Sequence, residues 1–84
     1  MANTVNVRYF AVLRDQAKID QEIVSMDQIT GKSCADLYDF LQEKYQFKFN
    51  KEQLRLAINH QFSDWNYQLQ QADIVAFIPP VSGG

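Results

Sequence analysis

The sequence contains few of the residues that usually carry enzyme chemistry. Its 84 residues include one cysteine, Cys34, and one histidine, His60, so no internal disulfide can form. Cys34 falls on the apolar stripe of a predicted helix and His60 at a predicted turn, and we interpret them as a core residue and an exposed turn residue. Metal sites draw on closely spaced cysteine, histidine and carboxylate side chains, which the sequence lacks, so we expect no metal site.

Long apolar runs and clusters of basic residues are missing as well. No segment approaches the roughly 18 apolar residues of a membrane-spanning helix, and residues 1–5 lack the basic and apolar regions of a signal peptide. The net charge is -2 and the isoelectric point is near 5.1, with lysines and arginines scattered along the chain. We therefore expect a cytoplasmic protein whose partners are neither membranes nor nucleic acid.

Alternation and helical spacing predict the local structure. Residues 5–11 alternate apolar and polar, which predicts a strand with Arg8 and Phe10 on the face opposite Val7. Ser33 caps a helix whose apolar positions recur every three or four residues, and Asp36 completes a capping box. The other expected elements are a short helix or turn at 11–17, strands at 20–26 and 55–59, a short edge strand within 62–69, and a wholly apolar strand at 74–78.

The order of these elements predicts an α+β domain, in which a mixed sheet of about five strands carries one main helix on one face. The first and last strands are expected to be parallel neighbours at its centre. So short a chain buries only about 60% of its surface on folding, which favours a rigid binding or carrier domain over a deep catalytic cleft. The carboxylates Asp36, Asp39 and Glu43 fall outside the apolar stripe of the helix, and we interpret them as solvated surface groups.

Glycine is scarce, and its placement marks the end of the chain. Two of the three glycines, Gly83 and Gly84, come last, and they follow Pro79 and Pro80, which stop the preceding strand. Prolines favour an extended exit, and six extended residues reach about 20 Å. We therefore expect a domain over residues 1–78 and a projecting tail over residues 79–84. The residues alone favour a functional arm and a frayed end equally.

The last strand is apolar on both faces, although a sheet covered by one helix normally alternates. Val75 can fill the core, which leaves Ile74, Ala76 and Ile78 on the other face. Phe10 lies on the matching face of the first strand. We interpret Phe10, Ile74, Ala76 and Ile78 as an exposed apolar patch beside the root of the tail, of the kind that binds a partner protein.

The C-terminal sequence VAFIPPVSGG, residues 75–84, resembles the end of molybdopterin synthase small subunits, the MoaD type of ubiquitin-like sulfur carrier. Residues 10–15, 33–41 and 57–59 extend the resemblance over most of the chain. It implies a β-grasp fold, in agreement with the predicted order of elements. Ala72 stands where this family usually has glycine, and Ile74 stands where a charged residue is usual.

The resemblance also implies a function centred on Gly84. An activating enzyme of the ubiquitin type uses ATP to adenylate the Gly84 carboxylate, sulfur from a persulfide donor displaces AMP, and a thiocarboxylate remains. The tail residues that enter the large synthase subunit are Pro80, Val81, Ser82, Gly83 and Gly84. There the sulfur attacks cyclic pyranopterin monophosphate and builds the dithiolene of molybdopterin. This scheme, which the family carries out as a heterotetramer, assigns no bound cofactor and no catalytic side chain to the chain itself.

Three other functions remain open at this level. Sulfur carriers for thiamine synthesis or tRNA thiolation also end in Gly-Gly, although the preceding Pro-Pro-Val-Ser points to molybdopterin. A ubiquitin-like modifier uses the same activation chemistry but joins its terminal glycine to a lysine. The third alternative is a plain interaction domain whose tail is incidental.

Overall fold

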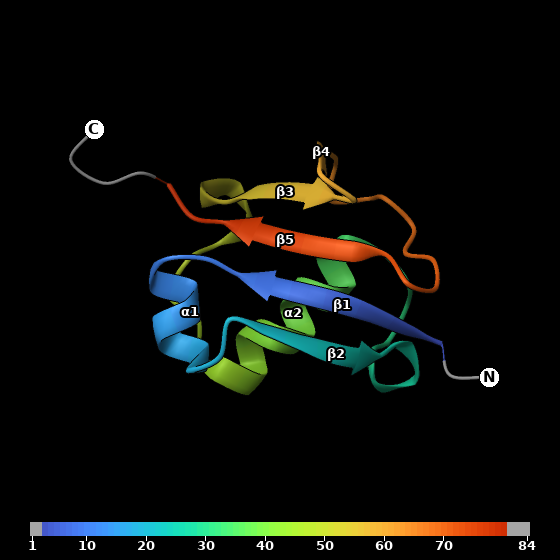
Figure 1. Ribbon diagram of the computed structural model, residues 1–84, viewed down its shortest axis with the longest axis horizontal. Helices are drawn as coiled ribbons and strands as arrows, with labels where there is room; N and C mark the ends of the chain where they lie inside the picture. Colours follow the sequence, from blue (N-terminus) through green and yellow to red (C-terminus); the bar gives the residue numbers. More distant parts are fainter. Residues whose placement is uncertain (1–2, 81–84) are drawn as a thin grey trace.

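The computed structural model describes residues 3–80, which form a five-stranded sheet with the longer helix across one face (Figure 1). The elements are β1 (Thr4–Tyr9), α1 (Val12–Ala17), β2 (Gln21–Ser25), α2 (Cys34–Tyr45), β3 (Arg55–Ile58), β4 (Gln61–Phe62) and β5 (Ile74–Ile78), with 3-10 helices at Met26–Gln28 and Lys51–Gln53. The strand order is β2-β1-β5-β3-β4, in which β1 and β5 are parallel and the other neighbours antiparallel. This topology confirms the predicted β-grasp fold and its parallel central pair.

The two central strands carry the core on the side that faces α2. Val5, Val7 and Tyr9 of β1 are at most 2% exposed, and Val75 and Phe77 of β5 are fully buried. The intervening residues of both strands are only half-buried. The sheet therefore has one face packed against α2 and one face that α2 leaves uncovered, which we call the open face.

The helix α2 begins and ends where its sequence supplies caps. The Ser33 hydroxyl accepts a hydrogen bond from the Asp36 N–H at 3.1 Å, and the Asp36 carboxylate accepts one from the Ser33 N–H at 3.2 Å. This confirms the predicted capping box and gives Asp36 a structural role beyond that of a solvated surface group. At the other end Gln46 takes a left-handed conformation, with φ of 60°, and its N–H donates to the Gln42 carbonyl.

Two details differ from the sequence expectations. The apolar stripe expected for α2 consists of Cys34, Leu37, Leu41 and Tyr45 and omits Tyr38. Tyr38 is nevertheless fully buried, packs on Phe77 with ring centroids 5.2 Å apart, and donates its hydroxyl to the Phe49 carbonyl at 2.6 Å. The short edge strand β4 comes directly after the turn at residues 59–60, one residue before the expected region 62–69, which it overlaps only at Phe62. The rest of that region is irregular apart from one bridge, between Ser33 and Gln68.

The turn before β5 contains a strained residue. Ala72 has φ of 70°, a left-handed conformation that residues with a Cβ atom rarely adopt. It thus occupies a position suited to glycine, the residue that the resembled family usually places there. Within residues 3–80, neither helix combines the length and the apolar character needed to cross a bilayer.

Candidate functional site

The open face carries a groove of about 310 Å³. It lies over the three adjacent strands β1, β5 and β3 and reaches the edge strand β4. Its lining consists of Arg8, Phe10, Ala57, His60, Phe62, Ile74, Ala76 and Ile78. Large apolar side chains are exposed here, since Phe10 is 45% and Phe62 is 70% exposed. Such exposed apolar area is typical of a surface that binds another molecule.

The strand register explains why the surface is hollow. Ala76 of β5 lies between Arg8 of β1 and Ala57 of β3, and Ala57 in turn pairs with Phe62 of β4. In-register residues of neighbouring strands share one face of the sheet. Two alanines thus form a low floor, with longer side chains on both sides of it. A groove of this shape has room for a bulky side chain of another molecule.

All four residues of the predicted apolar patch line this groove, where Phe10 is exposed and Ile74, Ala76 and Ile78 are half-buried. Whether a partner binds there stays a prediction. The lining residues that sequence reasoning missed are Arg8, Ala57, His60 and Phe62. The sequence does indicate a place for Arg8 in this surface, because the alternation along β1 puts Arg8 on the same face as Phe10. The other three depend on where β3 and β4 lie in the sheet.

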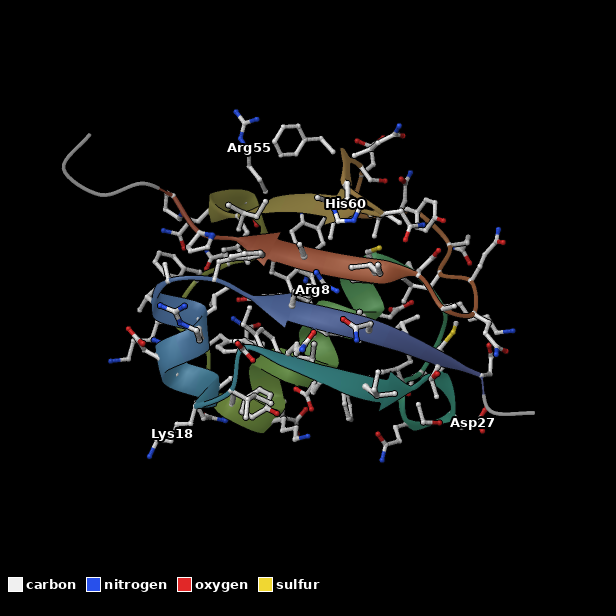
Figure 2. All side chains as sticks on the ribbon, viewed as in Figure 1. Arg8, Lys18, Asp27, Arg55 and His60 are labelled. Atoms are coloured by element: carbon white, nitrogen blue, oxygen red, sulfur yellow. The ribbon has the colours of Figure 1, made fainter. Side chains whose placement is uncertain are left out.

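A two-residue turn places Phe62 beside the groove. Asn59 and His60 connect β3 to β4 with φ of 52° and 75°, the paired positive values of a tight hairpin turn. Asparagine tolerates this conformation well. His60 is exposed at the turn, as predicted, and Figure 2 shows it beside the open face.

A buried carboxylate fastens that turn to the start of β5. Asp73 is 6% exposed, and its oxygens accept hydrogen bonds from Asn59 Nδ2 at 3.0 Å, the Tyr67 hydroxyl at 3.0 Å and the Gln70 N–H at 2.9 Å. The Asn59 side-chain oxygen accepts a further bond from the Ile74 N–H at 2.9 Å. These contacts hold the hairpin and β5 in a fixed relation, so the walls of the groove are preorganised.

The charge at the groove is positive. Arg8 is half-buried near the centre of the open face, where its Nε donates to Asn6 Oδ1 at 3.2 Å (Figure 2). The guanidinium of Arg55 lies 5.3 Å from the centre of the Phe62 ring, a cation–π contact. Neither arginine takes part in the two ion pairs found within residues 3–80. Those pairs are Lys44–Glu22 and Lys51–Asp39.

Cys34 occupies the core rather than a reactive site. It is fully buried at the first turn of α2, and burial raises the pKa of its thiol to about 12. A thiol with so high a pKa is a poor nucleophile at neutral pH. Among residues 3–80, no three histidine, cysteine or carboxylate side chains lie close enough together to hold a metal ion.

The root of the tail lies beside the groove. β1 and β5 run parallel, so Phe10 after β1 and Ile78 at the end of β5 both lie near the carboxyl ends of these strands, and both line the groove. Pro79 is buried and Pro80 is exposed. The remaining predicted tail residues, Val81, Ser82, Gly83 and Gly84, lie outside the described part of the chain.

Comparison with known proteins gives consistent matches along the chain. Residues 7–84 match the model of the ThiS family. The molybdopterin synthase sulfur carrier subunit of Mycobacterium tuberculosis is 33% identical over 82 residues, which are 95% of this chain and 96% of that protein. A similar fold occurs in SAMP1 from Haloferax volcanii, with a TM-score of 0.78 and 21% identity over 96% of this chain and 99% of that one. A chain in the complex of subunits 1 and 2 of the molybdopterin-converting factor from Helicobacter pylori matches with a TM-score of 0.66 and 27% identity, over 96% and 99% of the two chains.

Proposed function

The chain belongs to the ThiS family, and from this membership we propose that it is the sulfur carrier subunit of a molybdopterin synthase. The observation that carries the proposal is the 33% identity to such a subunit over 95% of this chain. Gly83 and Gly84 supply the terminal residues on which sulfur-carrier chemistry depends. The core position of Cys34 supports a role in which the chain delivers sulfur through its main chain rather than through a cysteine.

In the proposed cycle the carboxylate of Gly84 is the reacting group. In an activating enzyme it attacks the α-phosphorus of ATP, releases pyrophosphate and forms an acyl-adenylate, whose AMP is a good leaving group. The terminal sulfur of a persulfide then attacks the acyl carbon and displaces AMP, and a second thiol cleaves the resulting S–S bond to free the thiocarboxylate. This product is anionic and nucleophilic at neutral pH, so the chain needs no general base of its own.

The second half of the cycle takes place in a large subunit, which supplies the pterin pocket and the catalytic side chains. There the thiocarboxylate sulfur of Gly84 attacks cyclic pyranopterin monophosphate and forms a thioester between Gly84 and the pterin. Water then hydrolyses the acyl–sulfur bond, which leaves the sulfur on the pterin and regenerates the Gly84 carboxylate. Two such transfers build the dithiolene. The matched complex of two molybdopterin-converting factor subunits from Helicobacter pylori supports a partnership of this kind. The groove supports it as well, because it offers an apolar docking surface next to the strand that leads into the tail. Five residues follow the buried Pro79, and when fully extended they would reach about 17 Å into the partner.

A reconstituted reaction tests this proposal. The chain carrying a C-terminal thiocarboxylate, mixed with the large subunit of the same organism and cyclic pyranopterin monophosphate, should yield molybdopterin, which chromatography detects. The chain lacking Gly84 is the control and should yield none. Failure of the intact thiocarboxylated chain to form product would refute the assignment to molybdopterin synthesis. Product from a tRNA thiolation or thiamine assay, or a bond to a substrate lysine, would point to the rival carriers or to a protein modifier.

The docking surface has its own test. Phe10→Asp and Ile78→Asp each place a charge in the apolar lining of the groove, at positions that are exposed or half-buried. Each should weaken the complex with the large subunit, because the carboxylate must lose water when the surfaces meet. The complex is measured by copurification and by isothermal titration. Undiminished binding of both variants would show that the partner docks elsewhere.

A further inference from the structure

Two arginines lie at the open face: Arg8 lines the groove, and Arg55 lies just outside it, with its guanidinium against the Phe62 ring. Arg8 on β1 is in register with Ala76 of β5, and Arg55 on β3 is in register with Ile78 of the same strand. Figure 2 shows Arg8 near the middle of the open face and Arg55 beyond β3, next to an aromatic ring. The central strand β5 therefore lies between β1 and β3, which carry the two cations, and Ala76 of β5 and Ala57 of β3 form the alanine floor.

The spacing of the two cations follows from sheet geometry. β5 lies between β1 and β3, so two strand-to-strand steps of about 4.8 Å separate the outer two strands. Arg8 is opposite Ala76 and Arg55 is opposite Ile78, so the two arginines are also offset along β5 by two residues of about 3.3 Å each. The Cα atoms of Arg8 and Arg55 are thus roughly 12 Å apart across the sheet. At this separation salt screens their mutual repulsion, and one partner surface can contact both.

Neither arginine has an acidic partner within residues 3–80. No carboxylate oxygen of these residues lies within 4.0 Å of either guanidinium. The chain as a whole is acidic, with a net charge of -2, so carboxylates are plentiful elsewhere on it. Among residues 3–80, the one side-chain hydrogen bond of Arg8 goes to a neutral oxygen, that of the Asn6 side chain, and the guanidinium of Arg55 lies over the Phe62 ring. Arginine is enriched in protein interfaces because its planar fork pairs with carboxylates at two points.

We propose that the surface docking on this groove inserts a bulky apolar side chain over Ala57 and Ala76 and carries carboxylates that pair with Arg8 and Arg55. The two arginines thereby select the partner. The inference rests on the proposed function, since it takes the large synthase subunit as that partner. A second copy of this chain is a poor occupant, because face-to-face packing would bring four arginines together without carboxylates.

Charge-neutral variants test the arginines. The affinity of the chain for the large subunit is measured by isothermal titration at low and at high salt, for Arg8→Gln, Arg55→Gln and the double variant. Each single change should weaken binding about tenfold at low salt, the double change more, and all should flatten the salt dependence. Lys18→Gln removes the same charge from an exposed site away from the groove and should change affinity less than about twofold. Arg8→Lys keeps the charge and should recover part of the loss.

A variant that fills the hollow above the two alanines tests whether the partner inserts a side chain there. Ala76→Leu points out from the open face, so the fold should tolerate it, while the added carbons occupy the hollow and should weaken binding at least tenfold. If the wild-type chain binds but the arginine variants match it at both salt concentrations, the selection by charge is overturned and the proposed function stands. If the wild-type chain does not bind the large subunit, the proposed function itself fails. A dimer of the chain in sedimentation velocity that Ala76→Leu disrupts would make a second copy the occupant and would also overturn the inference.

Discussion

Replacing Phe62 with alanine separates docking from folding. Phe62 is 70% exposed on the edge strand β4, so its truncation removes little from the core. An aromatic side chain presents about 150–250 Å², and docking would cover most of the exposed part, roughly 120 Å². At about 25 cal/mol per Å² the lost burial is worth about 3 kcal/mol, which corresponds to a loss of affinity of about 100-fold.

The measurement is the dissociation constant of the complex with the large subunit, together with urea unfolding of the free chain. The free energy of unfolding of the Phe62→Ala chain should be lower than that of the wild type by less than about 1 kcal/mol, mainly because the cation–π contact with Arg55 is lost. Ile23→Ala is the matched control, because Ile23 is 63% exposed on β2 but does not line the groove. Its affinity should equal that of the wild type. A Phe62→Ala chain that binds within threefold of the wild type would refute the groove as the docking surface.

Three further predictions concern the fold that supports the groove. Ala72→Gly should raise the free energy of unfolding by about 1 kcal/mol, because it relieves the left-handed conformation at φ of 70°; equal or lower stability in urea would contradict this. Asp73→Ala should lower the free energy of unfolding in urea by at least about 2 kcal/mol and should weaken docking, because it leaves three hydrogen-bond donors near the hairpin without an acceptor. A decrease below about 0.5 kcal/mol would show that the donors find other partners. Burial raises the pKa of Cys34 and of Tyr38 to about 12, so stability should be fully present below pH 9 and fall as the pH rises toward 12. Cys34→Ala should make that fall shallower, and an identical alkaline profile would exclude the thiol as a cause.

Much of the fold was predictable because apolar residues recur at strand or helix spacing in its central elements. Alternation in β1, the capping box before α2 and the apolar run of β5 each reflect local physics that the chain displays directly. The parallel pairing of the first and last strands then brings Phe10 to the same face as Ile74, Ala76 and Ile78. That is why the apolar patch was predictable as one surface.

The rest of the groove depends on contacts between distant residues. Phe62 and His60 reach the groove only because the hairpin turn lies beside β5, and the hydrogen bond from Asn59 to Asp73, 14 residues later in the sequence, holds the turn there. No local pattern reveals such a bond. Tyr38 was missed for a related reason. It lies at helical spacing from Cys34, but only the fold shows that its hydroxyl reaches the Phe49 carbonyl and makes full burial possible.

The sulfur-carrier role is tested most directly by the intact mass of the chain isolated from cells that make molybdopterin. Replacing one oxygen of the Gly84 carboxylate with sulfur adds about 16 Da, and fragmentation should place this gain on the last residue. The gain should disappear in the chain lacking Gly84 and in cells without the activating enzyme. A chain that carries the unmodified mass while the cells produce molybdopterin would contradict the proposed role.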